Sequence, residues 1–224
     1  MKKIFTFILA LTMSFTIYAS PTILPQENIP LLKEDSAEVK GLNSLKILLG
    51  RENGFELGSS ITRADAVVLL MRMHPDNTGA LGMPSPQFDD MDGHWAYKEV
   101  TAAKKMGLIN GTSSTTFTPD RPVSGREFAK MMLCLLGYKN ITIENAYSLG
   151  EEYGLINNNF TRSVVYDNRE LLRSDAARLC WSALASKTSG GELLYKKLVQ
   201  SGKYKEDDFF GILFISDYTE KHLL

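Results

Sequence analysis

The chain has 224 residues, is 44% hydrophobic and carries a formal net charge of −1. This composition is that of a folded globular protein and excludes the disordered, collagen-like and coiled-coil classes. A charge so close to zero argues against nucleic acid as the main partner, because phosphate binding normally requires a basic excess. With two Cys and three His, the chain fits neither a disulfide scaffold nor a cysteine-rich metal protein.

The N-terminus has the features of a secretory signal peptide, which we assign to residues 1–19. Two Lys precede an apolar run that extends to Tyr18, and Ala19 offers a small residue at the cleavage point. The run is too short to span a bilayer comfortably, so an uncleaved N-terminal anchor is the less favoured alternative. We expect an exported protein with no membrane contact after cleavage, followed by an extended lead-in at residues 20–35.

The body of the chain repeats one unit three times. Each unit contains an amphipathic helix, a turn marked by Gly or Asn, a loop with a buried hydrophobic residue, and a second, more apolar helix. Such a unit cannot bury its own apolar faces, so the copies are expected to pack together. The three copies are assigned to residues 36–74, 88–138 and 139–187, with a linker at 75–87.

Particular positions carry the repeat. Gly50 of the first copy corresponds to Gly111 of the second, and Gly107 of the second corresponds to Gly154 of the third, whereas the first copy has Lys46 there. The second helices should form the shared core because they are the most apolar segments. They cover residues 66–73, 128–136 and 176–184.

The starts of the second helices contain the candidate binding groups. Thr62 with Asp65, and Ser124 with Glu127, fit capping boxes that are sufficiently explained by helix structure. Arg63 is not explained in this way, because a cation in the first turn faces the positive end of the helix dipole. Arg173 has the same placement. Each guanidinium, with the free N–H groups of its helix start, could bind an external carboxylate or phosphate; a charge pairing with a neighbouring copy is the alternative.

The tandem copies resemble S-layer homology domains, which attach exported bacterial proteins non-covalently to the cell wall. The likeness is carried by the segments 88–96, 107–111 and 116–131, by Thr62-Arg63-Ala64-Asp65 as a variant of the family's Thr-Arg-Ala-Glu signature, and by Arg173-Ser174-Asp175. The resemblance implies a mainly α-helical pseudo-threefold spindle around a central helical bundle. It also implies grooves that bind anionic, often pyruvylated, secondary cell-wall polysaccharide, with the signature Arg as the anion contact.

Departures from the family pattern limit the number of working grooves to one or two. In the second copy Gly125 stands in place of the signature Arg, and Arg126 follows one position later, about 100° around a helix. In the third copy Leu172 replaces the signature Thr. The residues predicted to contact the ligand are Thr62, Arg63, Asp65, Trp95, Gly111, Ser124, Arg126, Glu127, Arg173 and Asp175.

Several other features are given structural interpretations. Trp95 is interpreted as a packing anchor in preference to a sugar platform, and Asp92 as the N-cap of the helix that follows it. Cys134 and Cys180 are expected to be inert core thiols, with a disulfide as the alternative. The tail at 188–224 should contain a short helix at 192–200 and a β-prone segment at 209–215.

The sequence therefore predicts a secreted, non-enzymatic protein of a Gram-positive-type cell wall that needs no cofactor or metal. Its expected partner is an anionic cell-wall polysaccharide, with another surface protein as a second candidate partner. The alternative function is a protein-interaction or structural surface module whose degenerate grooves no longer bind glycan. A wall-remodelling enzyme is the least favoured class, because the sequence shows no convergent acid–base constellation.

Overall fold

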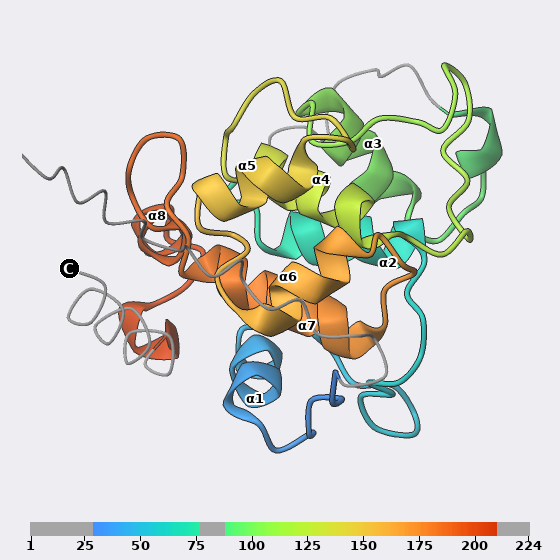
Figure 1. Cartoon of the computed structure of the whole chain (residues 1–224). Helices are drawn as coiled ribbons and strands as arrows, with labels where there is room; N and C mark the ends of the chain where they lie inside the picture. The colour runs from blue at the N-terminus through green and yellow to red at the C-terminus, as the bar shows by residue number, and fades with distance from the viewer. Residues whose placement is uncertain (1–28, 77–87, 210–224) are drawn as a thin grey trace, which may run out of the picture.

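The computed structural model describes residues 29–76 and 88–209 of the protein. Within these ranges the chain is helical, with isolated backbone bridges and no sheet (Figure 1), which confirms the mainly α class. The predicted signal peptide and most of the linker lie outside the described residues. The helices are α1 (Ala37–Ser44), α2 (Arg63–Arg72), α3 (Tyr97–Lys105), α4 (Gly125–Leu135), α5 (Ala146–Glu152), α6 (Asn159–Tyr166), α7 (Arg173–Leu184) and α8 (Leu194–Gln200), with short 3₁₀ turns η2 (Asp89–Met91) and η3 (Glu206–Phe209).

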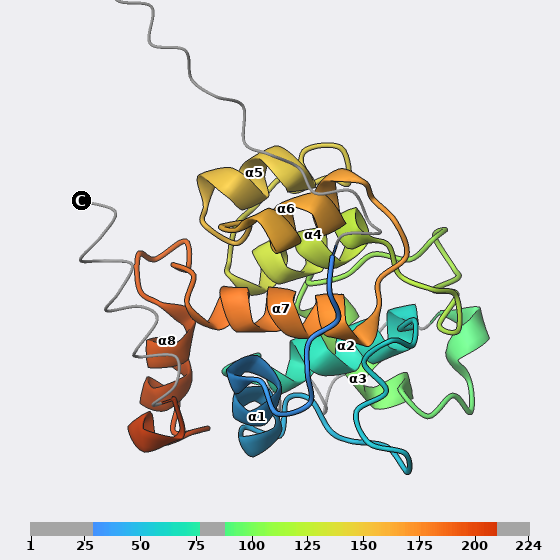
Figure 2. The same cartoon turned by 60° about the horizontal axis from the view of Figure 1, so that its bottom comes forward.

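Helices α2, α4 and α7 form the core, as expected for the second helices of the three copies. All of α7 and most of α2 and α4 are buried. Helix α4 lies against both α2 and α7 (Figures 1 and 2). The other helices cover this centre: α3 packs on α2, α5 on α4, and both α1 and α6 on α7. The core therefore comes from three segments that lie far apart in the sequence.

The predicted capping boxes are present at two of these helices. The Thr62 hydroxyl accepts from the Asp65 N–H, and the Asp65 carboxylate accepts from the Thr62 N–H, both at 3.1 Å. Ser124 and Glu127 make the same two bonds at the start of α4. At α7, Leu172 has no hydroxyl, so only the Asp175 carboxylate contributes, at 3.0 Å from the Leu172 N–H. These bonds satisfy N–H groups that a helix start otherwise leaves unpaired.

The segments just before the three core helices join in a closed cycle of backbone hydrogen bonds. The Ile61 N–H donates to the Leu171 carbonyl at 3.0 Å, the Leu171 N–H to the Val123 carbonyl at 2.9 Å, and the Val123 N–H to the Ile61 carbonyl at 3.1 Å. All three side chains are buried. Each copy thus supports the next at an equivalent place. The cycle favours a threefold arrangement, while the full spindle and its three-copy division remain a prediction.

The turn that follows the first helix has an equivalent backbone conformation in all three copies. Gly107 and Gly154 have φ values of +71° and +78°, and Lys46 at the corresponding place has +56°. A Lys side chain rarely adopts this left-handed conformation, so the turn itself imposes it. The alignment of Lys46 with the two Gly positions therefore describes a real structural correspondence.

The third copy differs from the other two in its loop. Helix α6 occupies the segment between α5 and α7, and the buried Val165 lies within this helix where a loop residue was expected. The α6 backbone approaches α4 so closely that a Cβ on Gly125 would collide with the Val164 carbonyl oxygen. Gly125 is therefore required by packing, which is why the signature Arg cannot stand there.

Two details correct the sequence interpretation of helix α3. The helix begins at Tyr97 with Ala96 as its cap residue, so the assignment of Asp92 as N-cap is wrong. The cap region is fixed instead by His94, whose Nδ1 lies 3.1 Å from the Ala96 N–H. Trp95 is 62% exposed, so its interpretation as a packing anchor is also wrong.

The C-terminal tail begins with the expected short helix, α8. Helix α8 contacts α7, and η3 contacts both α8 and α1 (Figure 2). Phe209 is buried in η3, and the rest of the predicted β-prone segment lies outside the described residues. Cys134 and Cys180 are free thiols, and burial raises the pKa of both. The disulfide alternative is thereby excluded for this pair in the structure.

Candidate functional site

Arg173 is the first residue of α7 and reaches across to the first copy. Its Nε donates to the Phe55 carbonyl at 2.7 Å and its Nη2 to the Leu49 carbonyl at 2.9 Å. The residue is only 6% exposed, and within the described part of the chain no carboxylate pairs with it. Burial, together with the positive charge of Arg51, lowers the pKa of Arg173. An almost buried guanidinium without an acidic partner is costly and normally has a counter-charge.

Arg173 lines an open pocket of about 250 Å³ between α7, α2 and the loop of the first copy, which we call the Arg173 pocket. Its charged side chains are three guanidinium groups and one carboxylate. Arg51 lies at 3.7 Å from Asp65 and pairs more closely with Glu56, at 2.8 Å. The lining residues are Leu48, Leu49, Gly50, Arg51, Asp65, Val68, Leu69, Arg72, Trp95 and Arg173. The excess of positive charge suits an anionic ligand.

Trp95 forms one wall of the Arg173 pocket and is contributed by the second copy. Its ring is largely exposed and contacts His94 at 5.4 Å between ring centroids. An indole face beside a cluster of guanidinium groups offers apolar contact for a sugar ring and charge contact for an acidic substituent. The geometry therefore favours the sugar-platform interpretation that the sequence analysis had placed second.

Arg63 repeats the placement of Arg173 one copy further along. Its Nε donates to the Phe117 carbonyl at 2.9 Å and its Nη2 to the Asn110 carbonyl at 3.0 Å. The difference is an ion pair, because Nη1 lies 2.9 Å from Glu127. Arg63 is 3% exposed, and burial lowers its pKa while Glu127 opposes that effect. Arg63 thus pairs with a carboxylate of a neighbouring copy. This is the alternative to an anion site that the sequence left open.

A second pocket, the Arg63 pocket, lies beside this ion pair and measures about 280 Å³. Gly111 is needed here because a Cβ would collide with the carbonyl oxygens of Ser113 and Thr116. Its charged side chains are Arg63, Lys130 and one carboxylate, Glu127. The lining residues are Arg63, Leu108, Ile109, Asn110, Gly111, Thr112, Glu127, Lys130, Met131 and Ile143. The Arg63 pocket is therefore the less positive of the two.

The backbone N–H groups at the helix starts do not face either pocket. The Arg63 N–H donates to the Arg121 carbonyl, and the Ala64 N–H to the Pro119 carbonyl. The Arg173 N–H likewise donates to the Ser59 carbonyl at 2.8 Å. The expectation that free N–H groups would bind the anion together with the Arg side chain is therefore wrong. These helix-start N–H groups therefore do not contribute an anion contact in either pocket.

The structure also separates the predicted contact residues into two groups. Arg63, Asp65, Trp95, Gly111, Glu127 and Arg173 line the two pockets. The other four lie outside both pockets, and their side chains bond within the protein: Thr62 with Asp65, Ser124 with Asn168, Arg126 with the Val165 and Tyr166 carbonyls, and Asp175 with Arg169. These side chains thus have structural roles within the fold, and their assignment as ligand contacts stays a prediction.

Three positively charged lining residues were missed by the sequence reasoning. Arg51 follows Gly50 and Arg72 ends α2, while Lys130 lies six residues after the cap residue Ser124. Arg51 and Arg72 lie outside the segments that carry the family resemblance, and Lys130 lies within one of them but was not proposed as a ligand contact. A signal did exist for Arg51, because the residue after Gly50 corresponds to Thr112 after Gly111, and both residues line their pockets.

The comparison with protein families identifies the second copy. Residues 87–129 match the model of the S-layer homology domain. The chain carries an S-layer homology domain. The match spans η2, α3, the loop with Gly111 and the start of α4, so it includes Trp95 and Glu127 from the two pockets. The three-copy organisation of the chain remains a prediction beyond this S-layer homology domain.

Two characterised relatives share part of the sequence. The chain is 33% identical over 86 residues to cell surface glycoprotein 1 of Acetivibrio thermocellus, covering 38% of this chain and 4% of that protein. It is 30% identical over 115 residues to an endoglucanase of a Bacillus species, covering 51% of this chain and 11% of the enzyme. The chain thus spans a small part of each relative.

Together, the S-layer homology domain and the surface relative support a cell-surface location and a cell-wall anchoring role in general terms. The S-layer homology domain is a non-catalytic binding module. In the described residues, no helix has the length and apolar character needed to cross a bilayer.

Proposed function

We propose that the protein binds an acidic, pyruvylated cell-wall polysaccharide through the Arg173 pocket and thereby attaches to the wall of a Gram-positive-type bacterium without catalysis. The observation that carries the proposal is the Arg173 guanidinium, almost buried, unpaired within the described chain and beside an open pocket. A carboxylate on the ligand would supply the missing counter-charge. Residues 1–19 are the export signal in this proposal.

The Arg173 pocket offers separate places for the charge and for the sugar ring. The Nε and Nη2 groups of Arg173 are held by two carbonyls, which leaves Nη1 without a partner among the described residues. Arg51 and Arg72 lie in the same pocket and add positive charge. The exposed Trp95 ring lines the same pocket and is contributed by another copy. A saccharide with one acidic substituent would use both the indole ring and the guanidinium groups, and its binding would weaken with added salt.

The Arg63 pocket is proposed as a weaker second site for the same ligand. Its guanidinium is already neutralised by Glu127, so a ligand carboxylate would have to compete with an internal one. In the second copy Gly125 stands at the signature position, so that copy supplies no signature Arg for a third site for an acidic sugar. One strong site and one weak site agree with the expectation of one or two working grooves.

Binding to purified wall sacculi, before and after removal of the attached polysaccharide, tests this function. Wild-type protein should bind intact sacculi and lose binding after stripping. Trp95→Ala should reduce binding at least tenfold, whereas Tyr166→Ala should not, because Tyr166 is also an exposed aromatic residue but lies outside the pockets. Arg51→Gln should weaken binding and Lys139→Gln, an exposed control of the same charge change, should not.

Three results would overturn or redirect the proposal. Binding that survives stripping would indicate a protein or peptidoglycan partner. It would favour the alternative function, a protein-interaction module whose degenerate grooves no longer bind glycan. Equal binding by Trp95→Ala and wild type would show that the Arg173 pocket is not the contact surface. Release of sugar fragments from the sacculi would indicate an enzyme.

A further inference from the structure

His94 lies just before α3 and directly precedes Trp95, the exposed aromatic residue of the Arg173 pocket. Its Nδ1 lies 3.1 Å from the Ala96 N–H, which can only donate, so Nδ1 is the acceptor and carries no proton. The ring proton is then on Nε2, which lies 3.3 Å from the Asp120 carboxylate and donates to it. The two contacts together require a neutral imidazole.

The hydrogen bond to Nδ1 closes a turn around the Trp95 backbone. It joins a side chain to the N–H two residues further on, as an Asn or Asp side chain does in an Asx turn. The Tyr97 N–H donates to the His94 carbonyl at 3.0 Å across the same turn. The Trp95 side chain is 62% exposed, and its ring lies 5.4 Å from the His94 ring between centroids. Because most of the indole faces solvent, its direction depends on this turn and on the His94 ring.

Protonation of His94 would remove the acceptor that closes the turn. An imidazolium carries an N–H at both nitrogens, so Nδ1 and the Ala96 N–H would meet as two donors. Ala96 is fully buried, so its N–H would lose its partner without gaining water, which is unfavourable. Histidine is the side chain that commonly changes charge between pH 5 and pH 8. The turn is therefore built to respond to mild acid.

The charged groups around His94 do not replace the lost acceptor. Asp120 faces Nε2, and its side chain is 82% exposed, where an ion pair contributes little. Asp90 of η2 already accepts from two backbone N–H groups of the loop before α4. The other charged side chains of the neighbouring segments are Arg72, Asp89, Asp92, Lys98, Glu99 and Arg121. Protonation thus costs the bond to Ala96 and gains at most an exposed ion pair.

We propose that His94 is a positioning residue for Trp95 and makes ligand binding at the Arg173 pocket sensitive to mild acid. The neutral imidazole closes the turn and holds the indole at the pocket, and the protonated ring opens the turn and releases the indole. The inference rests on the proposed function for its ligand, an acidic saccharide, whereas the change at the turn needs no ligand. The protein would bind at neutral pH and detach in mild acid.

NMR of the ligand-free protein tests the turn by itself. In full-length protein labelled with ¹⁵N, the His94 ring should carry its proton on Nε2 at pH 8. The Ala96 amide and the Trp95 indole signals should shift together with the titration of His94 as the pH falls to 5.5. A proton on Nδ1 at pH 8, or Ala96 and Trp95 signals that ignore the titration of His94, would overturn the proposal.

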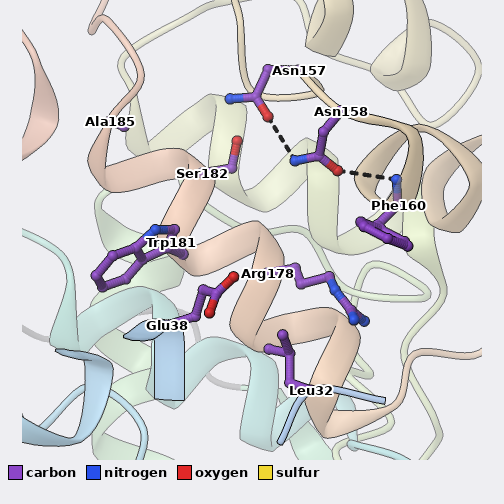
Figure 3. A pocket seen from close by; sticks show the side chains of 9 residues that line it. All are labelled: Leu32, Glu38, Asn157, Asn158, Phe160, Arg178, Trp181, Ser182 and Ala185. Atoms are coloured by element: carbon purple, nitrogen blue, oxygen red, sulfur yellow. Dashed lines mark hydrogen bonds between the residues drawn. The ribbon is translucent and has the colours of Figure 1, made fainter. Parts of the chain in front are cut away.

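The other Trp of the chain provides an internal reference. Trp181 of α7 is 8% exposed and lies beside Glu38 of α1 (Figure 3), where its ring is so close to Gly41 that a Cβ there would collide with it. Its indole signal should be the same in wild type and in a His94 variant throughout the titration. A general loosening of the fold in acid would move both indole signals and would contradict a local turn.

Variants separate the acceptor of His94 from its charge. Asn can accept from the N–H two residues on and does not titrate, so His94→Asn should restore the turn at every pH. Wild-type affinity for a pyruvate-ketal sugar should fall at least tenfold from pH 8 to pH 5.5, where the sugar carboxylate is still ionised. His94→Asn should bind within about twofold of the wild-type value at pH 8 under both conditions. His94→Ala has neither group and should bind at least tenfold more weakly at both.

His74→Asn is the matched control. The His74 Nδ1 also lies 3.1 Å from an N–H two residues further on, that of Asp76, but His74 does not line the Arg173 pocket, so this variant should keep the pH dependence. An equal loss of affinity in acid by His94→Asn and wild type, or wild-type affinity of His94→Ala at pH 8, would overturn the role of His94. Absence of wild-type binding at both pH values would count against the proposed function, and the NMR titration would still decide whether His94 positions Trp95.

Discussion

In the Arg173 and Arg63 pockets the Arg side chain is held by backbone carbonyls in the same way. The two pockets differ in the length of the acidic side chain that faces the Arg. In both, the Arg at a helix start donates through Nε and Nη2 to two carbonyls of the next copy. The carboxylate facing it comes from the third residue of the adjoining core helix. In the Arg63 pocket this residue is Glu127, which reaches the guanidinium at 2.9 Å. In the Arg173 pocket it is Asp65, which does not reach Arg173.

This difference shows that a capping residue can decide whether a neighbouring charge is available. Asp65 uses its carboxylate for the cap of α2, whereas Glu127 caps α4 and also pairs with both Arg63 and Arg121. One additional methylene group therefore separates a guanidinium neutralised within the fold from one that is left for a ligand. The start of α4 is a third case. Here Gly125 stands at the signature position, and the backbone of α6 occupies the space that an Arg side chain would need.

The largest expected effect is on stability and comes from a substitution at Gly125, at the start of α4. Gly125→Ala should lower the free energy of unfolding by roughly 2–4 kcal/mol, because its Cβ would collide with the backbone carbonyl of Val164, which cannot move independently of α6. Gly190→Ala is the control, since its Cβ would meet only the Thr188 hydroxyl at 3.7 Å. Equal stability of the two variants in urea unfolding would show that α6 does not fix residue 125.

The next effect is on the internal ion pair of the Arg63 pocket. Glu127→Gln should lower the free energy of unfolding by about 2 kcal/mol, because it leaves the nearly buried Arg63 without its carboxylate. The exposed Glu152→Gln serves as the control for removing a negative charge. The same variant should strengthen binding of an acidic saccharide at the Arg63 pocket. A variant as stable as wild type would mean that Arg121 or solvent compensates Arg63 fully.

Exchanging Asp and Glu between positions 65 and 127 tests directly whether the length of the acidic side chain distinguishes the two pockets. Asp65→Glu should allow the carboxylate to reach Arg173 and weaken binding of the acidic saccharide about tenfold, near 1.4 kcal/mol. Glu127→Asp should do the opposite at the other pocket by releasing Arg63. Titration of each variant with a pyruvate-ketal sugar measures both changes. If the two variants shift affinity in the same direction, side-chain length is not what distinguishes the pockets.

The smallest effect is a difference in acid sensitivity. Burial alone would raise the pKa of Glu127, but bonds from Arg121 and from the Ser124 N–H, with the charge of Arg63, outweigh it and hold this pKa below its usual value of 4.5. As the pH falls, the unfolded chain takes up this proton first, so the stabilisation is complete above pH 4.5 and is lost below it. The stability advantage of wild type over Glu127→Gln should therefore shrink in acid. A constant difference from pH 6 to pH 3 would contradict the assignment.

The sequence was informative wherever the chemistry is local. The capping boxes at Thr62 and Ser124 follow from residues three positions apart, and the apolar runs of the second helices predicted which segments form the core. Both Arg side chains were singled out because a cation at a helix start is locally unfavourable. Asp92 failed as a cap because the chain continues through an extra turn before α3 begins at Tyr97.

What the sequence could not supply was the identity of each long-range partner. Arg63 and Arg173 have the same local context, yet one meets Glu127 from another copy and the other meets no carboxylate in the described chain. Trp95 was expected inside and lies exposed on a pocket wall, because that wall is completed by the loop of a different copy.

The sequence by itself determined the helical class and the starts of the core helices α2 and α4, since these depend on periodicity and on bonds spanning three or four residues. The tertiary structure alone decided which charges are neutralised, which pocket keeps a positive excess, and why Gly125 stands where an Arg was expected. Those outcomes depend on which backbone approaches which helix start, and that approach is set by the cyclic packing of Ile61, Val123 and Leu171.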